Sequence, residues 1–325
     1  MTSRVHVVLS CLLLGLSLLG PPAAAPPAAA APVVGEGPEP PPPGSLRLRH
    51  LHSSSAWTTA PPVVAADVGG WQRSVDLLTM TESGGGVRQA ALRAPGWSTA
   101  WFEGRGPRPG RRADASVRWR DAVWVERARA SLPLSERTYP VKEGAARGIT
   151  PNATAAVLER RDTGVVLLVT VAHLPSLVER ADGTGLDRAP ELASRLAAYG
   201  DALAGYREQV DTMTRRHDPD VRLVVADWNV DAKRPWARTL LREAWAGSGL
   251  VPAWPASYDG PGTFDDEREG HVRSRLIDGA LVDAAATHLE APRVLAPTSS
   301  SDHRPFVTTI GLPAAPGETA VTPLG

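Results

Sequence analysis

The sequence has very few residues of several types, and each shortage excludes a class of protein. A single cysteine, Cys11, excludes a disulfide scaffold and any Cys-rich zinc or iron–sulfur site. Lysine occurs twice against 33 arginines. Because arginine, alanine, glycine and proline have GC-rich codons, this bias reflects genome composition rather than a basic partner. The 35 basic and 35 acidic residues give a formal net charge of zero, so tight non-specific binding to nucleic acid is not indicated.

The N-terminal segment has the pattern of a targeting sequence. An apolar run from Val7 to Leu19 is followed by small residues with Ala-x-Ala spacing, which predicts a secretory signal peptide over residues 1–31. A bilayer span needs about 20 apolar residues, and this run is shorter, which favours a signal peptide. An uncleaved signal anchor is the alternative. The Pro-rich stretch 32–44 cannot pack a core and is expected to be a disordered leader. We therefore expect a secreted protein.

The remaining chain is expected to form one domain over 45–312, followed by a flexible tail, 313–325, because no second Pro-rich linker and no repeat divides it. Alternating or continuous apolar runs predict strands. These lie at 46–52, 76–82, 119–127, 153–159, 164–171, 221–226, 276–282 and 305–310. Helices are predicted at 189–216 and 235–247. This mixture suggests a mixed sheet, or two stacked sheets, covered by helices.

Polar residues stand at the ends of several predicted strands. Taken singly, each has an ordinary explanation as a solvated strand end, a core histidine, or a turn or cap residue. The candidates are Glu82, His173, Asp227, Asn229, Asp278, Asp302 and His303. Their order along the chain changes the interpretation.

That order resembles the endonuclease/exonuclease/phosphatase superfamily, which includes pancreatic-type deoxyribonuclease, abasic-site endonucleases, bacterial sphingomyelinases and inositol-polyphosphate 5-phosphatases. The "ADWN" and "SDHRP" segments are the most specific pieces, and the resemblance covers roughly 45–312. It implies an α/β fold, a four-layer sandwich of two packed mixed β-sheets flanked by helices. It further implies a divalent-metal-dependent phosphoester hydrolase, and with the N-terminal segment the chain is expected to be an exported bacterial member.

The resemblance also assigns roles to the metal-binding and water-activating residues. Glu82 matches the metal-binding Glu of the family, and Asp302 with His303 matches its closing Asp-His. Asp227 and Asn229 match the family's Gly-Asp-x-Asn, with alanine in place of the glycine. The implied metal ligands are therefore Glu82 and Asp302, for Mg²⁺ or Mn²⁺, since these hard ions prefer oxygen.

Two further matches complete the expected catalytic set. Asp278 matches the strand Asp that would hydrogen-bond His303, and Gly279 follows it where an aromatic is common. His173 matches a histidine found in one branch of the family. The base that activates water is left open between Asp227 and His303, and the acid between His173 and His303. Asn229 would orient the water or the phosphate.

One position departs from the family pattern. The first family strand normally ends in an Asn that helps to position the metal, whereas this chain continues with Ser53-Ser54-Ser55. The departure keeps open a non-catalytic binding protein that retains the fold. Tyr139 and Arg147 are candidates for phosphate contact by position only.

The substrate is not determined by these motifs. An arginine-rich stretch could grip a nucleic-acid backbone, or it could be a solvated loop. Its arginines are Arg105, Arg108, Arg111, Arg112, Arg118 and Arg120. Exposed Trp97, Trp101 or Trp254 would instead favour a phospholipid surface. A nuclease or phosphodiesterase is the leading hypothesis, with a sphingomyelinase-like or small-phosphoester hydrolase as the alternative, and no stable protein partner is implied.

Overall fold

The computed structural model describes the following residues: 47–54, 59–83, 86–102, 115–135, 139–140, 148–149, 151–189, 192–268, 270–284, 286, 288–298 and 300–313. They all fall within one compact unit, 31–325. The predicted signal peptide and leader, and nearly all of the tail, lie outside the described residues, so those boundaries stay predictions. Within the described part, no helix combines the length and apolar character that a membrane span requires.

The first of two central sheets contains both chain ends of the described fold. In spatial order its strands are β15 (His288–Val294), β16 (Phe306–Gly311), β1 (Arg47–Ser54), β2 (Leu77–Thr81), β4 (Ser116–Arg120) and β3 (Trp97–Ala100). β1 and β2 run parallel, and the other neighbours are antiparallel.

The second sheet repeats this pattern of one parallel pair with antiparallel neighbours. Its strands are, in spatial order, β11 (Leu250–Pro252), β14 (Asp278–Asp283), β10 (Val221–Asp227), β9 (Val166–His173), β8 (Asn152–Arg160) and β5 (Trp124–Pro133). Here β9 and β10 are the parallel pair. In each sheet, the carboxyl ends of the two parallel strands therefore lie side by side at the same edge.

Two short hairpins and four helices complete the described elements. The hairpins pair β6 (Tyr139–Pro140) with β7 (Gly148–Ile149), and β12 (Phe264–Arg268) with β13 (His271–Arg275). The helices are α1 (Pro61–Trp71), α2 (Gly86–Ala91), α3 (Ala193–His217) and α4 (Pro235–Ala244).

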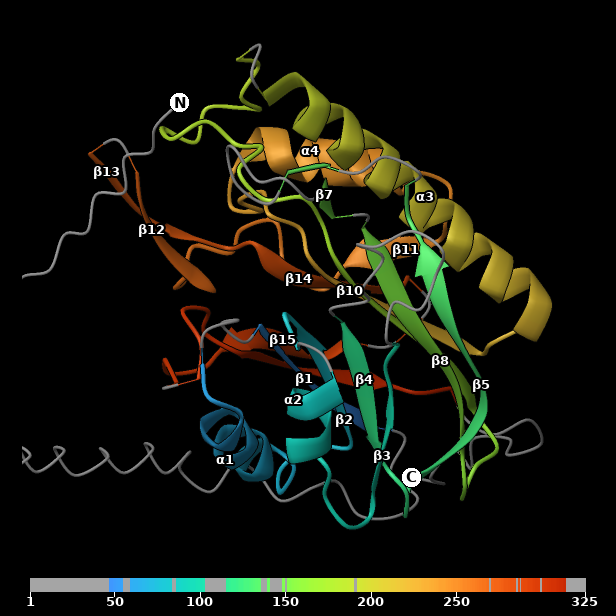
Figure 1. Ribbon diagram of the computed structural model, residues 1–325. Helices are drawn as coiled ribbons and strands as arrows, with labels where there is room; N and C mark the ends of the chain where they lie inside the picture. The colour runs from blue at the N-terminus through green and yellow to red at the C-terminus, as the bar shows by residue number, and fades with distance from the viewer. Residues whose placement is uncertain are drawn as a thin grey trace, which may run out of the picture. The chain divides into compact units, whose positions relative to one another are not determined.

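The sheets pack face to face and helices cover their outer faces (Figure 1). The largest apolar cluster combines Leu77 and Phe306 of the first sheet with Val169 and Val225 of the second. Another cluster joins α1 to the outside of the first sheet, and a third joins α3 and α4 to the outside of the second. This four-layer α/β sandwich confirms the expected fold class.

Helix α3 shows why the apolar pattern was informative. Tyr199, Leu203, Tyr206 and Val210 lie at helical spacing and are buried against the second sheet. The helix begins at Ala193, four residues later than predicted from the sequence.

The strand predicted at 119–127 is wrong. Residues 121–123 form a turn that separates β4 from β5, and these two strands belong to different sheets. The backbone N–H of Val123 donates to the Arg120 carbonyl across that turn. The apolar alternation continues on both sides, so periodicity alone joined two strands into one.

Candidate active site

Three neighbouring strands of the second sheet place three predicted residues side by side. His173 is the last residue of β9, Asp227 is the last residue of β10, and Asp278 is the first residue of β14. In the ladder, Asp227 is directly opposite His173 on one side and Asp278 on the other. The three side chains, which belong to different strands, therefore lie side by side at one edge of the second sheet.

His303 completes this arrangement from the segment that precedes β16. Its Nδ1 lies 2.7 Å from Asp278 Oδ2, within hydrogen-bond distance, and both side chains are buried. The Phe264 ring packs against the imidazole with a centroid distance of 4.9 Å. The backbone N–H of Asp278 donates to Thr263 Oγ1, which holds the start of β14 in place. The predicted contact between Asp278 and His303 is present.

Asn229 and His173 flank the carboxylate of Asp227. The backbone N–H of Asn229 donates to Asp227 Oδ1 at 3.0 Å, and His173 Nε2 lies 3.5 Å from Asp227 Oδ2. The Asn229 side-chain amide donates to the Leu174 carbonyl. Asn229 has a φ of 54°, in the left-handed region that Asn tolerates better than most residues. The turn therefore fixes Asn229 between the ends of β9 and β10.

Burial and neighbouring charge shift the pKa values in opposite directions. Burial disfavours the charged imidazole of His303, but the Asp278 carboxylate outweighs this and raises the pKa of His303 to about 9, with smaller contributions from Asp227 and Asp302. Burial also opposes ionisation of Asp278, yet His303 and His52 hold its pKa well below the usual range. Burial and then the charge of Asp278 raise the pKa of Asp227.

The donor atoms of Asp227, Asp278 and His303 lie within 4.8 Å of one another. Such a buried Asp/Asp/His group could bind a divalent metal ion, because two carboxylates there repel each other and a cation would relieve the repulsion. Among the described residues, neither of the predicted ligands Glu82 and Asp302 belongs to this group. Their assignment as metal ligands stays a prediction.

The structure places Asp302 next to His303 and Glu82 at the end of a strand of the first sheet. Glu82 follows β2, whose Thr81 pairs with Ser54 of β1, and it has a φ of 51°. A non-glycine residue with such a φ is uncommon and is found most often in turns and at functional sites. Asp302 is exposed and directly precedes His303, whose pKa it raises.

His52 is a site residue that the motifs did not indicate. It is buried in β1, and its Nε2 lies 3.3 Å from Asp278 Oδ1. The following residues, Ser53 and Ser54, are also buried and continue the strand. A signal did exist, since the alternation that buries Leu48 places His50 and His52 on the same face.

The packing around Gly279 explains why a glycine follows Asp278. A Cβ atom at this position would lie 3.1 Å from the Trp228 indole nitrogen and 3.3 Å from the Trp254 ring. Two indoles thus fill the space where an aromatic following Asp278 would lie. Trp254 is buried, and Trp97 and Trp101 are half-buried, so none of the three is the exposed aromatic that a lipid surface would require.

Two residues of the arginine-rich stretch lie in a strand of the first sheet. Arg118 and Arg120 belong to β4, and Arg118 is fully buried and donates to the Leu92 carbonyl. Arg120 donates to the Gln72 and Val75 carbonyls. These two arginines serve the first sheet, so their proposed grip on a nucleic-acid backbone is wrong. Some candidates lie outside the described residues, or have side chains there: Arg105, Arg108, Arg111, Arg112, Tyr139 and Arg147.

A second buried charged group supports the site, and we call it the arginine–carboxylate group. Its members are Glu179, Asp266, Arg268, Arg273 and Arg275. Arg273 Nη1 donates to Glu179 Oε1 at 2.9 Å and Arg275 Nε donates to Glu179 Oε2 at 3.1 Å. Arg275 also donates to the backbone carbonyl of Asn229, so this group ties the β12–β13 hairpin to the turn after β10.

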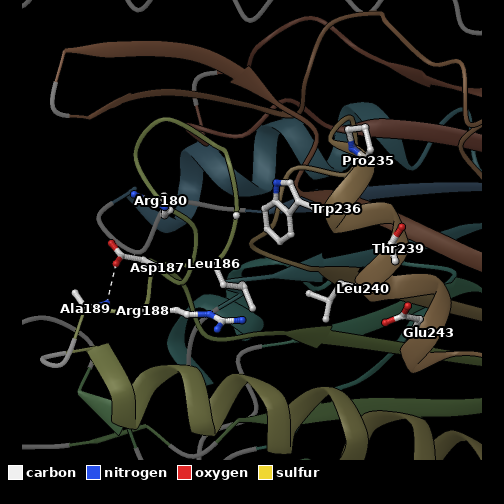
Figure 2. A pocket seen from close by; sticks show the side chains of 11 residues that line it. Arg180, Leu186, Asp187, Arg188, Ala189, Pro235, Trp236, Thr239, Leu240 and Glu243 are labelled. Carbon is white, nitrogen blue, oxygen red and sulfur yellow. Dashed lines mark hydrogen bonds between the residues drawn. The ribbon is translucent and has the colours of Figure 1, made fainter.

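The described surface also contains a cavity of about 830 Å³ away from these residues. Figure 2 shows it between the 180–189 segment and α4, with Trp236, Leu186 and Leu240 on its walls. No histidine and none of the converging aspartates line it. Its size therefore does not identify the chemistry, which lies at the strand ends.

Comparison of the sequence with protein families gives no match, and comparison with curated proteins gives none either. Solved structures do match. An endonuclease/exonuclease/phosphatase family protein from Bacteroides thetaiotaomicron aligns over 82% of this chain and 98% of its own, with a TM-score of 0.55 and 16% identity. These values establish a shared fold, and the chain has the endonuclease/exonuclease/phosphatase fold.

Two other structures with this fold show how different its substrates are. A mannosyl-6-phosphatase from Bacteroides thetaiotaomicron VPI-5482 covers 81% of this chain and 99% of its own length, with 15% identity and a TM-score of 0.52. D. rerio TDP2, solved with a single-strand DNA product, covers 81% and 98%, with 12% identity and a TM-score of 0.54.

Proposed function

We propose that this chain is a divalent-metal-dependent phosphoester hydrolase, most simply a phosphodiesterase or nuclease. The observation that carries the proposal is the buried contact between His303 and Asp278, which lies beside Asp227 at the strand ends. The fold supports it, because the structures it resembles include a phosphatase and an enzyme solved with a DNA product. Fold alone does not choose between substrates.

The pKa shifts suggest how the open roles are divided. A His303 pKa of about 9 means a protonated imidazole at neutral pH, so His303 acts as a proton donor or phosphate-binding cation rather than as the resting base. Asp227, with a raised pKa and one oxygen facing His173, takes the proton of the attacking water. These shifts support Asp227 rather than His303 as the base.

The reaction then follows from the positions of the groups. Water attacks phosphorus and gives a proton to Asp227, the bond from phosphorus to the leaving oxygen breaks, and that oxygen takes a proton from His303. Asp278 keeps the imidazole oriented through Nδ1 and leaves Nε2 for the substrate. Asn229 orients the phosphate or the water.

The carboxylates predicted at the site are suitable ligands for a divalent metal ion. Both oxygens of Asp278 face histidines, so we assign the cation to Glu82 and Asp302. Mg²⁺ or Mn²⁺ would be preferred, since the ligands are carboxylates. When bound, the ion neutralises charge on the phosphate.

The test is hydrolysis by the purified protein with Mg²⁺ or Mn²⁺, with and without chelator. Plasmid DNA, bis-(p-nitrophenyl) phosphate, p-nitrophenyl phosphate and sphingomyelin vesicles separate the substrate classes. We expect chelator-sensitive nicking of DNA that is lost in His303→Ala and kept in His217→Ala, a histidine at the end of α3. Cleavage of monoester or lipid alone would favour the alternative hydrolases, and no hydrolysis with no metal binding would favour a non-catalytic protein.

We also propose that the protein is exported, on the basis of the apolar run and small residues within 1–31. Mass spectrometry of the culture medium should find a mature N-terminus between residues 23 and 32. Retention of an intact N-terminus in the membrane fraction would instead support the uncleaved anchor.

A further inference from the structure

A row of buried polar side chains leads from inside the first sheet to Asp278. His50 Nε2 lies 2.8 Å from Thr79 Oγ1, and His52 Nδ1 lies 2.9 Å from the same oxygen. On its other side, His52 Nε2 lies 3.3 Å from Asp278 Oδ1. Asp278 Oδ2 in turn contacts His303. The row therefore crosses from β1 and β2 of the first sheet to β14 of the second.

This row is sealed from solvent. His50, Thr79, His52 and Asp278 are each at most 1% exposed. Phe306 packs beside both histidines, with centroid distances of 6.0 Å to His50 and 5.4 Å to His52. Polar groups buried this deeply are costly unless they have partners. Packing alone therefore does not explain why polar side chains, rather than apolar ones, lie between the two sheets here.

The donors and acceptors permit a consistent arrangement of protons. An ionised carboxylate only accepts hydrogen bonds, so the proton of His52 must lie on Nε2 for an attractive contact with Asp278. With Nδ1 of His52 as acceptor, the Thr79 hydroxyl donates to it and accepts from His50 Nε2. Burial, with a smaller effect of His52, holds the pKa of His50 well below its usual value, which leaves its Nδ1 as the unpaired acceptor.

We propose, on the basis of the hydrolase function proposed above, that His52 is a positioning residue, fixed by Thr79 and His50, whose Nε2–H holds Asp278 Oδ1 so that Oδ2 faces His303. Asp278 is then held between two histidines, one on each oxygen. Only His303 is placed to meet the substrate, and His52 acts through Asp278. In this chain His52 is therefore the residue that the first strand contributes to the site.

The kinetic test compares two replacements of one side chain. His52→Leu removes the donor but keeps an apolar volume, whereas His52→Gln keeps an N–H near the former Nε2. We expect His52→Leu to lower kcat by roughly tenfold or more with little change in KM, as for other residues that orient a reacting group. His52→Gln should recover most of kcat. His217→Leu, the same change at the end of α3, should leave both constants unchanged.

Loss of packing would give a different result. If His52→Leu acted only through the fold, kcat of the folded fraction would be unchanged, or Gln would restore nothing. Thr79→Val, which removes the hydroxyl between the two histidines, gives an independent variant whose kcat should fall less than in His52→Leu. Equal kcat in the wild type and in folded His52→Leu would overturn the proposal.

A spectroscopic test does not depend on hydrolysis. In the metal-free protein, two-bond ¹H–¹⁵N spectra should show His52 protonated at Nε2, and the Nδ1–H resonance of His303 should move upfield in His52→Leu. A His52 that carries its proton only on Nδ1 would overturn the proposal even in an active enzyme. If the wild type cleaves no phosphoester while these spectra are as expected, the hydrolase function fails and the positioning contact stands.

Discussion

Two buried charged groups contact the turn at Asn229, and they differ in the chemistry of their cations. In the arginine–carboxylate group, Glu179 and Asp266 are surrounded by three guanidinium groups that stay charged at every accessible pH. At the site, Asp227 and Asp278 face His52, His173 and His303, whose charge can change. The arginine–carboxylate group therefore fixes the positions of its members, whereas the aspartates and histidines of the site can exchange protons.

Their partners differ in the same way. Glu179 receives N–H donors from Arg273, Arg275 and the backbone of Asp231. At the site, His52 Nε2 and Asp278 Oδ1 have only their long mutual contact of 3.3 Å, and neither atom has another partner among the described residues. Incomplete satisfaction of buried groups is costly, and it is tolerated where function requires it. Replacing a carboxylate should therefore affect stability in one group and catalysis in the other.

The largest effect is expected for Asp278→Asn. The amide is isosteric but cannot hold the charged, correctly oriented imidazole of His303, so kcat should fall by about 10²- to 10⁴-fold with the fold retained. Asp283→Asn is the matched control, because Asp283 ends the same strand and pairs with Arg222. It should reduce stability without reducing kcat, and a loss of kcat equal to that of Asp278→Asn would contradict the assignment.

The next effect is on stability. Glu179→Gln leaves Arg273 and Arg275 buried with a neutral partner, which should lower the free energy of unfolding by about 3–5 kcal/mol, measured with urea. Glu267→Gln, on the exposed side of the same hairpin, should change it very little. Similar losses for the two variants would mean that the arginine–carboxylate group is not what anchors the hairpin.

The two groups should also respond differently to pH. Because the folded pKa of His303 is raised from 6.5 to about 9, its stabilising effect is complete below pH 6.5 and is lost as the pH rises through 9. The free energy of unfolding, measured with chelator present, should therefore fall across this range. In Asp278→Asn the fall should be much smaller, whereas Glu179→Gln should keep it. A flat wild-type profile from pH 6.5 to 9 would contradict the charged state of His303.

The sequence predicted which of these residues lie together better than it predicted the elements around them. Asp227, Asp278 and His303 lie in short motifs whose residue types are required by chemistry, so their order along the chain was informative. Strand β1 was harder, because alternation in "LRLRHLH" predicted one solvated face, whereas all but the first of its eight residues are buried. The alternation placed His52 on the same face as Leu48, but it could not show that this face brings His52 to Asp278.

Other elements lacked the signals on which sequence interpretation depends. Helix α1 is apolar around much of its circumference, so the buried stripe of Val64, Val68 and Trp71 does not stand out from its other side in the sequence. The β12–β13 hairpin is rich in charged residues and is held by the arginine–carboxylate group, so its order comes from long-range ion pairs. Those contacts join residues nearly a hundred positions apart, such as Glu179 and Arg275, and local patterns cannot reveal them.

The smallest expected effect comes from an ion pair of the same chemistry in a different environment. Arg127 pairs with Glu159 across β5 and β8, but its side chain is 58% exposed. Water already solvates both ions, so Arg127→Ala should change the free energy of unfolding by about 0–1 kcal/mol. Urea denaturation beside Glu179→Gln measures this directly, and 0.5 M salt should reduce the effect of Arg127→Ala further. A loss as large as that of Glu179→Gln would mean that pairing, rather than burial, sets the strength of these contacts, and the contrast between the two buried groups would then need a different explanation.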